Sequence, residues 1–302
     1  MATTTPYANF VLENKIESVL ITQLNMQQFC TADFSLQQSA GMTKKIHVYS
    51  STGAAEDLAE GVGNTGNIAP QWDEATYTVL ETQARFPYYD EQAMTDPAFI
   101  EAGVKGLAEA MTNDITEKVV AEFGKANLGM AGVTWAVNDF IDALSLYPYE
   151  DENNLFILMN PKQKAATRKA LKDELKYVED FARTGYIGHI MGCPVYITKA
   201  VPEGYAFIAT KEAVTIFTKK AVETETERDA NTRKNTIYTR QPRVIALTDA
   251  TRVIVMDAGT YTKTSDQSVV SSKSYYVKAA GGAYQLVADP KTADIGNYYE
   301  RA

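Results

Sequence analysis

The sequence predicts a mixed α+β fold, and three observations carry this prediction. Residues 95–124 keep one apolar helical periodicity over a stretch that is long for a globular domain. Residues 128–215 alternate helical and strand-like patterns, which is typical of an α/β unit. Strand-like alternation at residues 43–51 and 75–86 flanks a glycine-rich segment and predicts an extended two-stranded ribbon.

Composition limits the functions that the chain can have. Its 302 residues with 45% hydrophobic content can bury a sizeable core. The formal net charge of -9 repels phosphate backbones, so we expect any contact with nucleic acid to be local and weak. Cys30 and Cys193 lie far apart in the sequence, which favours reduced thiols. We find neither a signal-peptide pattern nor a long apolar run, and we expect a protein made in a cytoplasm with no membrane partner.

The segment GVGNTG at residues 61–66 has the G-x-G-x-x-G pattern of dinucleotide-binding proteins. A working fingerprint follows a buried strand and opens a helix whose N-terminus holds the pyrophosphate. Here an acidic run precedes the glycines, and Pro70 follows where the helix would continue. Because glycine and asparagine favour turns with positive φ, the sequence predicts a flexible loop tip and no cofactor.

Residues 8–29 predict an amphipathic N-terminal arm. Its apolar positions at near-helical spacing are Val11, Ile16, Leu20 and Leu24. Such a stripe packs on the subunit's own core or on a partner, and the sequence leaves both arrangements open.

The long helix over residues 95–124 has clear boundary signals. Thr95 or Asp96 can cap its first turn, and Gly124 can end it. The predicted apolar face consists of Ile100, Val104, Leu107, Met111, Ile115, Val119 and Phe123. The polar positions predicted off that face are Glu101, Lys105, Glu109, Asn113 and Glu117. Gly103 and Gly106 weaken a helix, so we expect either close packing or a bend at these residues.

The remainder of the chain supplies further helices and strands. We predict helices over residues 134–147 and 161–175, strands over 153–160, 193–201 and 204–210, and long strands within 219–257. From Gly259 onward the long apolar runs cease, and Ser, Thr, Tyr and Gly become frequent. This change predicts a small appended β-module with a turn at Gly281–Gly282.

One strand pattern carries a ladder of carboxylates. In VETETERD, Glu223, Glu225 and Glu227 alternate with threonines and would share one sheet face. Like charges aligned in this way repel each other unless basic side chains face them. The candidate partners within the chain are Arg228, Arg233 and Lys234, and a neighbouring subunit is the alternative source.

The sequence shows no pattern of residues for catalysis or metal binding. We find no nucleophile elbow, zinc-protease motif, P-loop or paired C-x-x-C. His189 and Cys193 have helical metal-ligand spacing, but Gly188, Gly192 and Pro194 disfavour a helix there. The acidic run at residues 150–152 lacks the spacing of a calcium loop. We therefore expect no catalytic residues, no metal site and no enzyme.

The order of these elements resembles the major capsid proteins of tailed bacteriophages, which have the Hong Kong 97-type fold. The resemblance covers residues 1–257 and is closest over residues 185–256, from GYIGHIMGCPVYITKAV to ALTDATRVIVM. Within it, a G-x-P-V strand is followed by a VPEG turn, a helix start at ATKEAV, and ETERDA. LFILMNP leading into a helix is also similar to the α/β domain of that family.

The resemblance implies a division of the chain into five regions. They are an N-terminal arm (1–40), an E-loop with its flanking strands (41–94), a spine helix (95–127) that forms a peripheral domain with residues 216–257, an axial domain (128–215), and a small β-rich C-terminal extension (258–302). The implied intersubunit residues at the E-loop tip are Glu60, Gly61, Gly63, Asn64, Gly66 and Trp72. The candidate intersubunit charge ladder is Glu223, Glu225, Glu227 and Arg228.

The implied function is a structural head protein that assembles into pentamers and hexamers of an icosahedral shell around double-stranded DNA. The implied partners are other copies of the chain, a separate scaffolding protein, a portal and decoration proteins, with no sequence-specific DNA binding. The implied location is the virion, after assembly in the cytoplasm of a bacterial host. Lys44 and Lys45 lie at the base of the loop and none lies in its tip, so we expect no isopeptide cross-link of the kind some relatives form.

Two alternatives stand beside this interpretation. The same fold could form an encapsulin-like compartment around a protein cargo, in which case isolated particles would hold an enzyme in place of DNA. A monomeric enzyme or binding domain could use a cleft in the α/β region, and would stay monomeric at any concentration.

Overall fold

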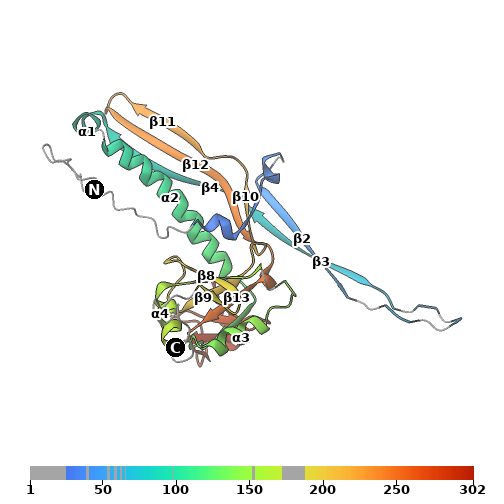
Figure 1. Ribbon diagram of the computed structural model, residues 1–302. Coiled ribbons are helices and arrows are strands. Elements are labelled where there is room, and N and C mark those ends of the chain that lie inside the picture. The colour runs from blue at the N-terminus through green and yellow to red at the C-terminus, as the bar shows by residue number, and fades with distance from the viewer. Residues whose placement is uncertain are drawn as a thin grey trace.

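The computed structural model describes residues 25–38, 41–52, 55–57, 60–61, 63–64, 66–96, 98–151, 154–171 and 188–302. Figure 1 shows a long helix along an elongated sheet, an α/β body at the foot of that helix, and a ribbon that projects away from both. The predicted α+β class is confirmed. Residues 8–24 of the predicted N-terminal arm lie outside the described residues, and its described end is a 3-10 helix, η1 (Met26–Phe29).

The elongated sheet is organised around one strand, β12 (Lys234–Leu247). It pairs in antiparallel fashion with β11 (Glu223–Asp229), β4 (Leu80–Tyr89) and β10 (Val214–Thr218). The short β1 (Thr31–Asp33) joins β10 in parallel and is followed by η2 (Ser35–Gln37). Because β12 is 14 residues long, it can hold three antiparallel partners at once.

The predicted long helix is α2 (Ala98–Phe123), which packs on β4 and β12 along the sheet. A short helix, α1 (Asp90–Thr95), precedes it. The Asp96 carboxylate accepts a hydrogen bond from the Ala98 amide at 3.0 Å, as an N-terminal cap does. Gly124 follows the last helical residue, so both predicted boundaries are confirmed.

The predicted apolar face of α2 is buried from Leu107 onward. Val104 is 48% exposed, contrary to the prediction, because the core that α2 joins lies at the other end of the helix. Glu109 was predicted to lie off the buried face, but it is only 7% exposed and has the Lys105 ammonium 3.9 Å away. The residues buried as predicted are Leu107, Met111, Ile115, Val119 and Phe123.

The α/β body contains a six-stranded sheet in the order β5-β13-β9-β6-β8-β7. Its strands are β5 (Leu128–Ala131), β6 (Phe156–Met159), β7 (His189–Ile190), β8 (Cys193–Ile197), β9 (Tyr205–Ala209) and β13 (Val253–Asp257). The helices are α3 (Val137–Ser145), α4 (Pro161–Ala170) and the 3-10 helix η4 (Ala250–Arg252). Within the described residues, the helices predicted over 134–147 and 161–175 and the strands predicted over 153–160, 193–201 and 204–210 are confirmed, with shorter bounds than predicted.

The helix start expected at ATKEAV is wrong. After β9 the chain turns at residues 210–213 and enters β10 directly. The Ala213 carbonyl accepts hydrogen bonds from the amides of Thr248 (2.8 Å) and Asp249 (3.2 Å), which hold the turn against the end of β12. Val214 is fully buried and pairs with Leu247 of β12 as a residue of the sheet.

The ribbon consists of β2 (Thr43–Thr52) and β3 (Ala69–Thr78), which pair in antiparallel register. The single strand predicted over residues 75–86 is wrong, because the chain breaks at Val79 and continues as β4 in the elongated sheet. Val79 is buried beside Leu36 and Phe217, and its amide donates to the Met42 carbonyl at 2.7 Å. Burial of this one side chain therefore separates the ribbon from the sheet.

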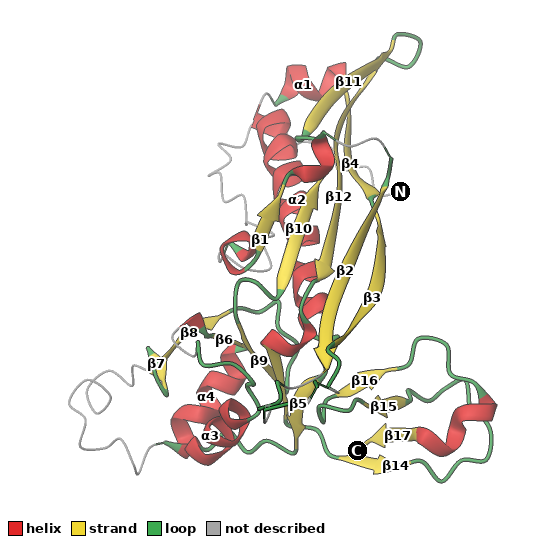
Figure 2. Cartoon of the chain, turned by 90° about the vertical axis from the view of Figure 1, so that its right-hand side faces the viewer, coloured by secondary structure: helices red, strands yellow, loops and turns green. Residues whose placement is uncertain are grey.

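The predicted C-terminal β-module is an antiparallel sheet in the order β14-β17-β15-β16, visible at the lower right of Figure 2. Its strands are β14 (Tyr261–Lys263), β15 (Tyr276–Lys278), β16 (Tyr284–Leu286) and β17 (Tyr298–Arg301), with the 3-10 helix η5 (Thr292–Asn297) before β17. Gly282 has a φ of 92° in the turn between β15 and β16, as the glycine pair predicts.

The module is bonded to the rest of the subunit at several places, among them Gly281 and Ala283 beside β5. The Gln285 amide donates to the Lys125 carbonyl at 2.8 Å, just past the end of α2. The Arg301 guanidinium donates to the buried Asp257 carboxylate at 2.7 Å and to the Tyr205 hydroxyl at 2.9 Å. The module is therefore a fixed part of the subunit.

Two apolar clusters form the main cores. The first joins η1 and the C-terminal half of α2 to both sheets through residues such as Phe29, Val119, Phe207 and Ile245. The second fills the α/β body and includes Phe140 and Ile254. The first cluster therefore holds the elongated sheet and the α/β body together.

The two glycines of α2 offer a matched test of packing. A Cβ atom at Gly103 would lie 2.2 Å from the Phe86 ring of β4, whereas one at Gly106 would meet no atom within 4 Å. We expect Gly103→Ala to lower the free energy of unfolding by about 1–3 kcal/mol through overpacking. Gly106→Ala should raise it by about 0.5–1 kcal/mol through helix propensity. Urea unfolding measures both values, and equal shifts in the same direction would contradict this assignment.

The C-terminal module should loosen in acid. Hydrogen bonds from Tyr275 and Lys273 lower the pKa of Asp266, and hydrogen bonds from Thr264 and Lys273 lower the pKa of Glu300. Since both folded-state pKa values lie below the unfolded ones, their stabilisation is complete above about pH 4 and is lost as the pH falls through the folded values. Hydrogen exchange of residues 264–275 measures the transition. Lys273→Met should move it to higher pH, and an unchanged transition would refute the role of Lys273.

Candidate assembly surfaces

The ribbon places the glycine-rich segment between two antiparallel strands. GVGNTG follows β2 and precedes β3, so no helix begins after it and the fingerprint lacks its structural context. Gly61 has a φ of 85°, and the Asn64 side chain accepts a hydrogen bond from the Gly66 amide at 2.7 Å. These are turn features, so the preference for a loop over a nucleotide site is supported.

The predicted tip residues do not all lie at the tip. Glu60, Gly61, Gly63 and Asn64 are exposed between the two strands, and Gly66 is half-buried near them. Trp72 instead lies within β3, opposite Tyr49, and belongs to the shaft of the ribbon. Its assignment to the tip is wrong, because β3 begins at Ala69 and pairs up to Thr52.

The ribbon exposes large apolar side chains. Trp72 is 60% exposed and Ile68 is 68% exposed. Near the base, Lys45 forms an ion pair with Glu74 across the two strands. The ribbon projects away from both cores, as Figure 1 shows, so neither core of its own subunit can cover these apolar groups.

The glutamate ladder finds partners inside the subunit, but not the ones predicted. Arg240 of β12 lies 2.6 Å from Glu225 and 3.4 Å from Glu223. The Tyr238 hydroxyl donates to Glu227 at 3.1 Å. The cause is strand register, because Glu223 faces Arg240 and Glu225 faces Tyr238 across the β11–β12 pair.

Two of the three basic residues predicted as partners, Arg228 and Arg233, contact other groups. Arg228 lies 2.9 Å from Asp90, and Arg233 lies 2.7 Å from Glu91, both in α1. The structure thus separates Arg228 from the glutamates with which it was grouped. In the strand order, β11 is an edge strand that pairs only with β12 within the described sheet. A charged edge of this kind opposes indiscriminate strand pairing.

The other candidate sites have structural explanations. His189 and Cys193 belong to the β7–β8 hairpin, whose turn residues Met191 and Gly192 both have positive φ. The helix that their metal-ligand spacing would need is therefore absent.

The second cysteine, Cys30, is buried, and burial raises the pKa of its thiol to about 12. The thiol therefore stays protonated at neutral pH. The described part of the chain has no group of three or more His, Cys, Asp or Glu residues placed to hold a metal ion, nor a helix long and apolar enough to cross a membrane.

Sequence patterns missed a polar cluster at the junction of the two sheets. Its centre is Arg252 of η4, which contacts the nearby Asp249 and two carboxylates from other segments, Asp151 and Glu212. Asp151 is 101 residues away from Arg252 in the sequence, and Glu212 also lies in a separate segment. No local pattern could have joined them.

Several known proteins are similar to this chain in sequence or in structure. The major capsid protein of Staphylococcus phage phiMR11 is 24% identical over 270 residues, which cover 82% of this chain and 92% of that protein. The capsid of a native GTA particle has a TM-score of 0.65 at 13% identity, covering 80% of this chain and 93% of the other. A virus-like particle from Pyrococcus furiosus has a TM-score of 0.53 at 12% identity, covering 77% of this chain and 91% of the other. No protein-family profile matches.

The solved structures establish the fold, and the sequence relative connects it with a phage shell. The capsid and the virus-like particle share this architecture, so fold alone does not separate a phage head from another closed shell. The relative found by sequence is a phage protein and does not favour the compartment alternative. The chain is therefore a structural shell protein with the Hong Kong 97-type fold, and its sequence is similar to that of a phage major capsid protein.

Proposed function

We propose that copies of this chain assemble as hexamers and pentamers into a closed icosahedral phage head around double-stranded DNA. The observation that carries the proposal is the ribbon of β2 and β3. A lone two-stranded ribbon is marginal in water. This one packs on its subunit at its base, through Ile46 and Tyr77, while its shaft exposes apolar side chains and projects away from the two main cores. In a shell, a second copy of the chain supplies the surface that the ribbon lacks.

The contact residues in this proposal follow the ribbon from its tip to its shaft. Glu60, Gly61, Gly63, Asn64 and Gly66 would meet the neighbouring subunit at the tip, and Trp72 would bury its indole ring along the shaft. Burial of the indole ring would contribute more to the free energy of association than the tip residues, because burial of a large apolar side chain is worth about 1.5–3 kcal/mol.

The charge ladder is the second proposed contact. Glu225 is 61% exposed despite its bond to Arg240, and Arg228 is 59% exposed despite its bond to Asp90. Charged groups that keep this much exposure can exchange water for groups of a neighbouring subunit. We propose that they set the register of the contact, because charge pairs give specificity more than affinity.

Several partners belong to the same proposal. They are a separate scaffolding protein, a portal and decoration proteins, and the packaged DNA would be held without sequence readout. Assembly would take place in the cytoplasm of a bacterial host before the protein becomes part of the virion. The net charge of -9 is unfavourable for tight DNA contact, which suits a wall that must not hold its genome strongly.

No turnover is part of this function. The cavity at the foot of α2 has a volume of about 380 Å³ and lies between Val120, Phe207, Tyr276 and Tyr284. Its lining contains one carboxylate, Glu117, and no His, Cys, Lys, Arg or second carboxylate. General acid–base chemistry at neutral pH needs a group with a pKa near the working pH and a positioned partner, so this cavity gives the monomeric-enzyme alternative little support.

Removal of the ribbon tip tests the proposal directly. In the wild-type chain expressed alone, light scattering and negative-stain microscopy should detect shells, tubes or isolated pentamers and hexamers. Deletion of residues 58–69, with Asn-Gly closing the ribbon, should leave the subunit folded because neither core includes these residues, yet should abolish stable shells. Thermal unfolding checks the fold. Normal shells from the deletion variant would contradict the proposal, and so would a wild-type chain that stays monomeric at high concentration even when a lysate containing the scaffolding protein is added.

Neutralisation of the ladder tests the second contact. Glu225→Gln with Glu227→Gln should change the free energy of unfolding by no more than about 0.5–1 kcal/mol, since exposed ion pairs contribute little. If these carboxylates contact a neighbour, the same variant should assemble more slowly and with a weaker dependence on salt. Time-resolved light scattering at two salt concentrations measures both effects. Unchanged assembly kinetics would restrict the ladder to its role inside the subunit.

A further inference from the structure

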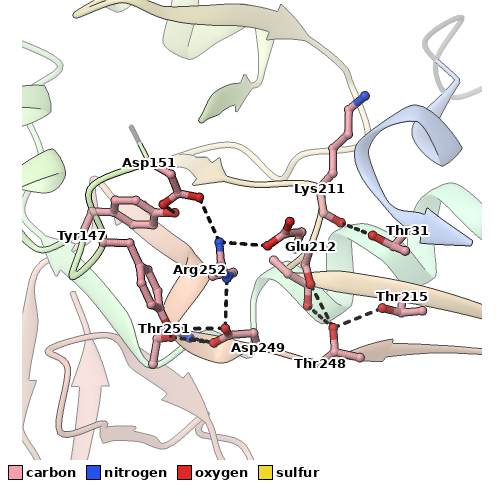
Figure 3. Close-up of polar contacts among 12 residues, drawn as sticks. Thr31, Tyr147, Asp151, Lys211, Glu212, Thr215, Thr248, Asp249, Thr251 and Arg252 are labelled. Atoms are coloured by element: carbon pink, nitrogen blue, oxygen red, sulfur yellow. Dashed lines mark hydrogen bonds and ion pairs between the residues drawn. The ribbon is translucent and has the colours of Figure 1, made fainter. Parts of the chain in front are cut away.

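Arg252 lies in the link between β12 and β13, at the junction of the two sheets (Figure 3). Its guanidinium donates hydrogen bonds to the carboxylates of Asp151 at 3.1 Å and Asp249 at 3.2 Å. It also lies 3.0 Å from the Glu212 carboxylate and 4.4 Å from the centre of the Tyr149 ring. With its side chain only 20% exposed, Arg252 contacts three carboxylates and one aromatic ring.

These contacts come from three segments of the chain. Asp151 and Tyr149 lie in the loop between α3 and β6 of the α/β body, and Glu212 lies in the turn from β9 to β10. The chain passes between the two sheets at residues 124–127, 210–213 and 248–252. Arg252 therefore joins the passage at residues 248–252 to the passage at residues 210–213 through Glu212. It joins both to the α/β body through Asp151.

The same cluster is bonded to the elongated sheet. The Thr248 hydroxyl donates to the Glu212 carbonyl at 3.1 Å and lies 3.2 Å from the Thr215 hydroxyl of β10. The Thr31 hydroxyl of β1 donates to the Lys211 carbonyl at 3.1 Å. Figure 3 shows these residues side by side, so polar contacts run continuously from the elongated sheet to the α/β body.

A second connection across the junction is the apolar cluster around Phe29, Phe207 and Ile245. Apolar burial is non-directional, so it favours contact between the sheets without selecting one angle between them. A planar guanidinium that donates along fixed directions is more restrictive. We infer that Arg252 is a positioning residue that fixes the angle between the elongated sheet and the α/β body, and thereby the curvature of the shell.

The charge state of the cluster supports this role. A hydrogen bond from the Tyr147 hydroxyl and the contact with Arg252 lower the pKa of Asp151. The carboxylate therefore stays ionised at neutral pH and keeps its bond to the arginine. Tyr147 is itself buried at the end of α3, so the loop that carries Asp151 is anchored in the body.

The first experiment measures the angle in the unassembled full-length subunit. Spin labels at Met94→Cys in α1 and Ile141→Cys in α3 report the distance between the two parts, since both positions are exposed and both native cysteines are buried. The otherwise wild-type chain should give one narrow distance distribution, and Arg252→Gln should broaden it. Arg252→Lys should give an intermediate width because it keeps the charge and loses the planar fork. The control Lys162→Gln, which breaks an exposed pair with Glu203, should leave the width unchanged.

The second experiment measures the shells, and here the inference rests on the proposed function. Wild-type shells should have one diameter by electron microscopy, whereas Arg252→Gln should give several diameters or open sheets. If Arg252→Gln fails to fold by circular dichroism, Glu212→Gln takes its place, because that carboxylate is largely exposed and its loss leaves both cores intact. Glu212→Gln removes one of the carboxylates that Arg252 contacts. It should therefore broaden both the spin-label distance distribution and the distribution of shell diameters relative to the wild type.

The outcomes separate the two ideas. A distance distribution as narrow in Arg252→Gln as in the wild type would overturn the inference, and so would shells of one unchanged diameter. If the wild-type chain forms no shells but the distance distribution broadens as expected, the shell function fails while the role of Arg252 at the junction stands.

Discussion

The structure depends on the register of β12 with its neighbours. Residues 234–243 of this strand pair with β4 while residues 243–247 pair with β10, so one backbone fixes the positions of two distant segments. Because β4 continues from β3 after the break at Val79, the same register sets where the ribbon leaves the body. It also places Arg240 opposite Glu223, which balances the charged edge. A shift of one residue would turn every side chain of β12 to the other face.

The junction of the two sheets combines two kinds of interaction with different consequences. The apolar cluster that includes Phe29 and Ile245 supplies most of the stabilisation, because its side chains are removed from water. The contacts of Arg252 restrict the relative orientation of the two sheets. They contribute less to the free energy of folding, since charged groups lose hydration when they are buried. A shell protein needs both properties, because its subunits must remain folded and must also repeat one geometry many times.

The sequence predicted elements whose signal is local and missed features that depend on tertiary contacts. α2, β6 and the Gly281–Gly282 turn follow from periodicity, length and glycine position within one segment. The break at Val79 and the burial of Glu109 depend on which surface each residue meets, and no window of sequence contains that surface. For the candidate contacts, the sequence located the ribbon and the glutamates. It could not assign Arg240 as their partner or Trp72 to the shaft, because both facts follow from strand register.

The two proposed contact regions, β11 and the ribbon, differ in chemistry. This difference limits which partner the subunit can bind. The edge strand β11 is covered with charges that have partners in their own subunit, so it gains little from contact with an arbitrary protein. The ribbon exposes Trp72 and Ile68, which gain free energy on any apolar surface. Specificity therefore has to come from geometry, since apolar groups alone do not choose a partner. A ribbon held at a fixed angle by β12, on a body held at a fixed angle by Arg252, can reach only a neighbour that is placed correctly.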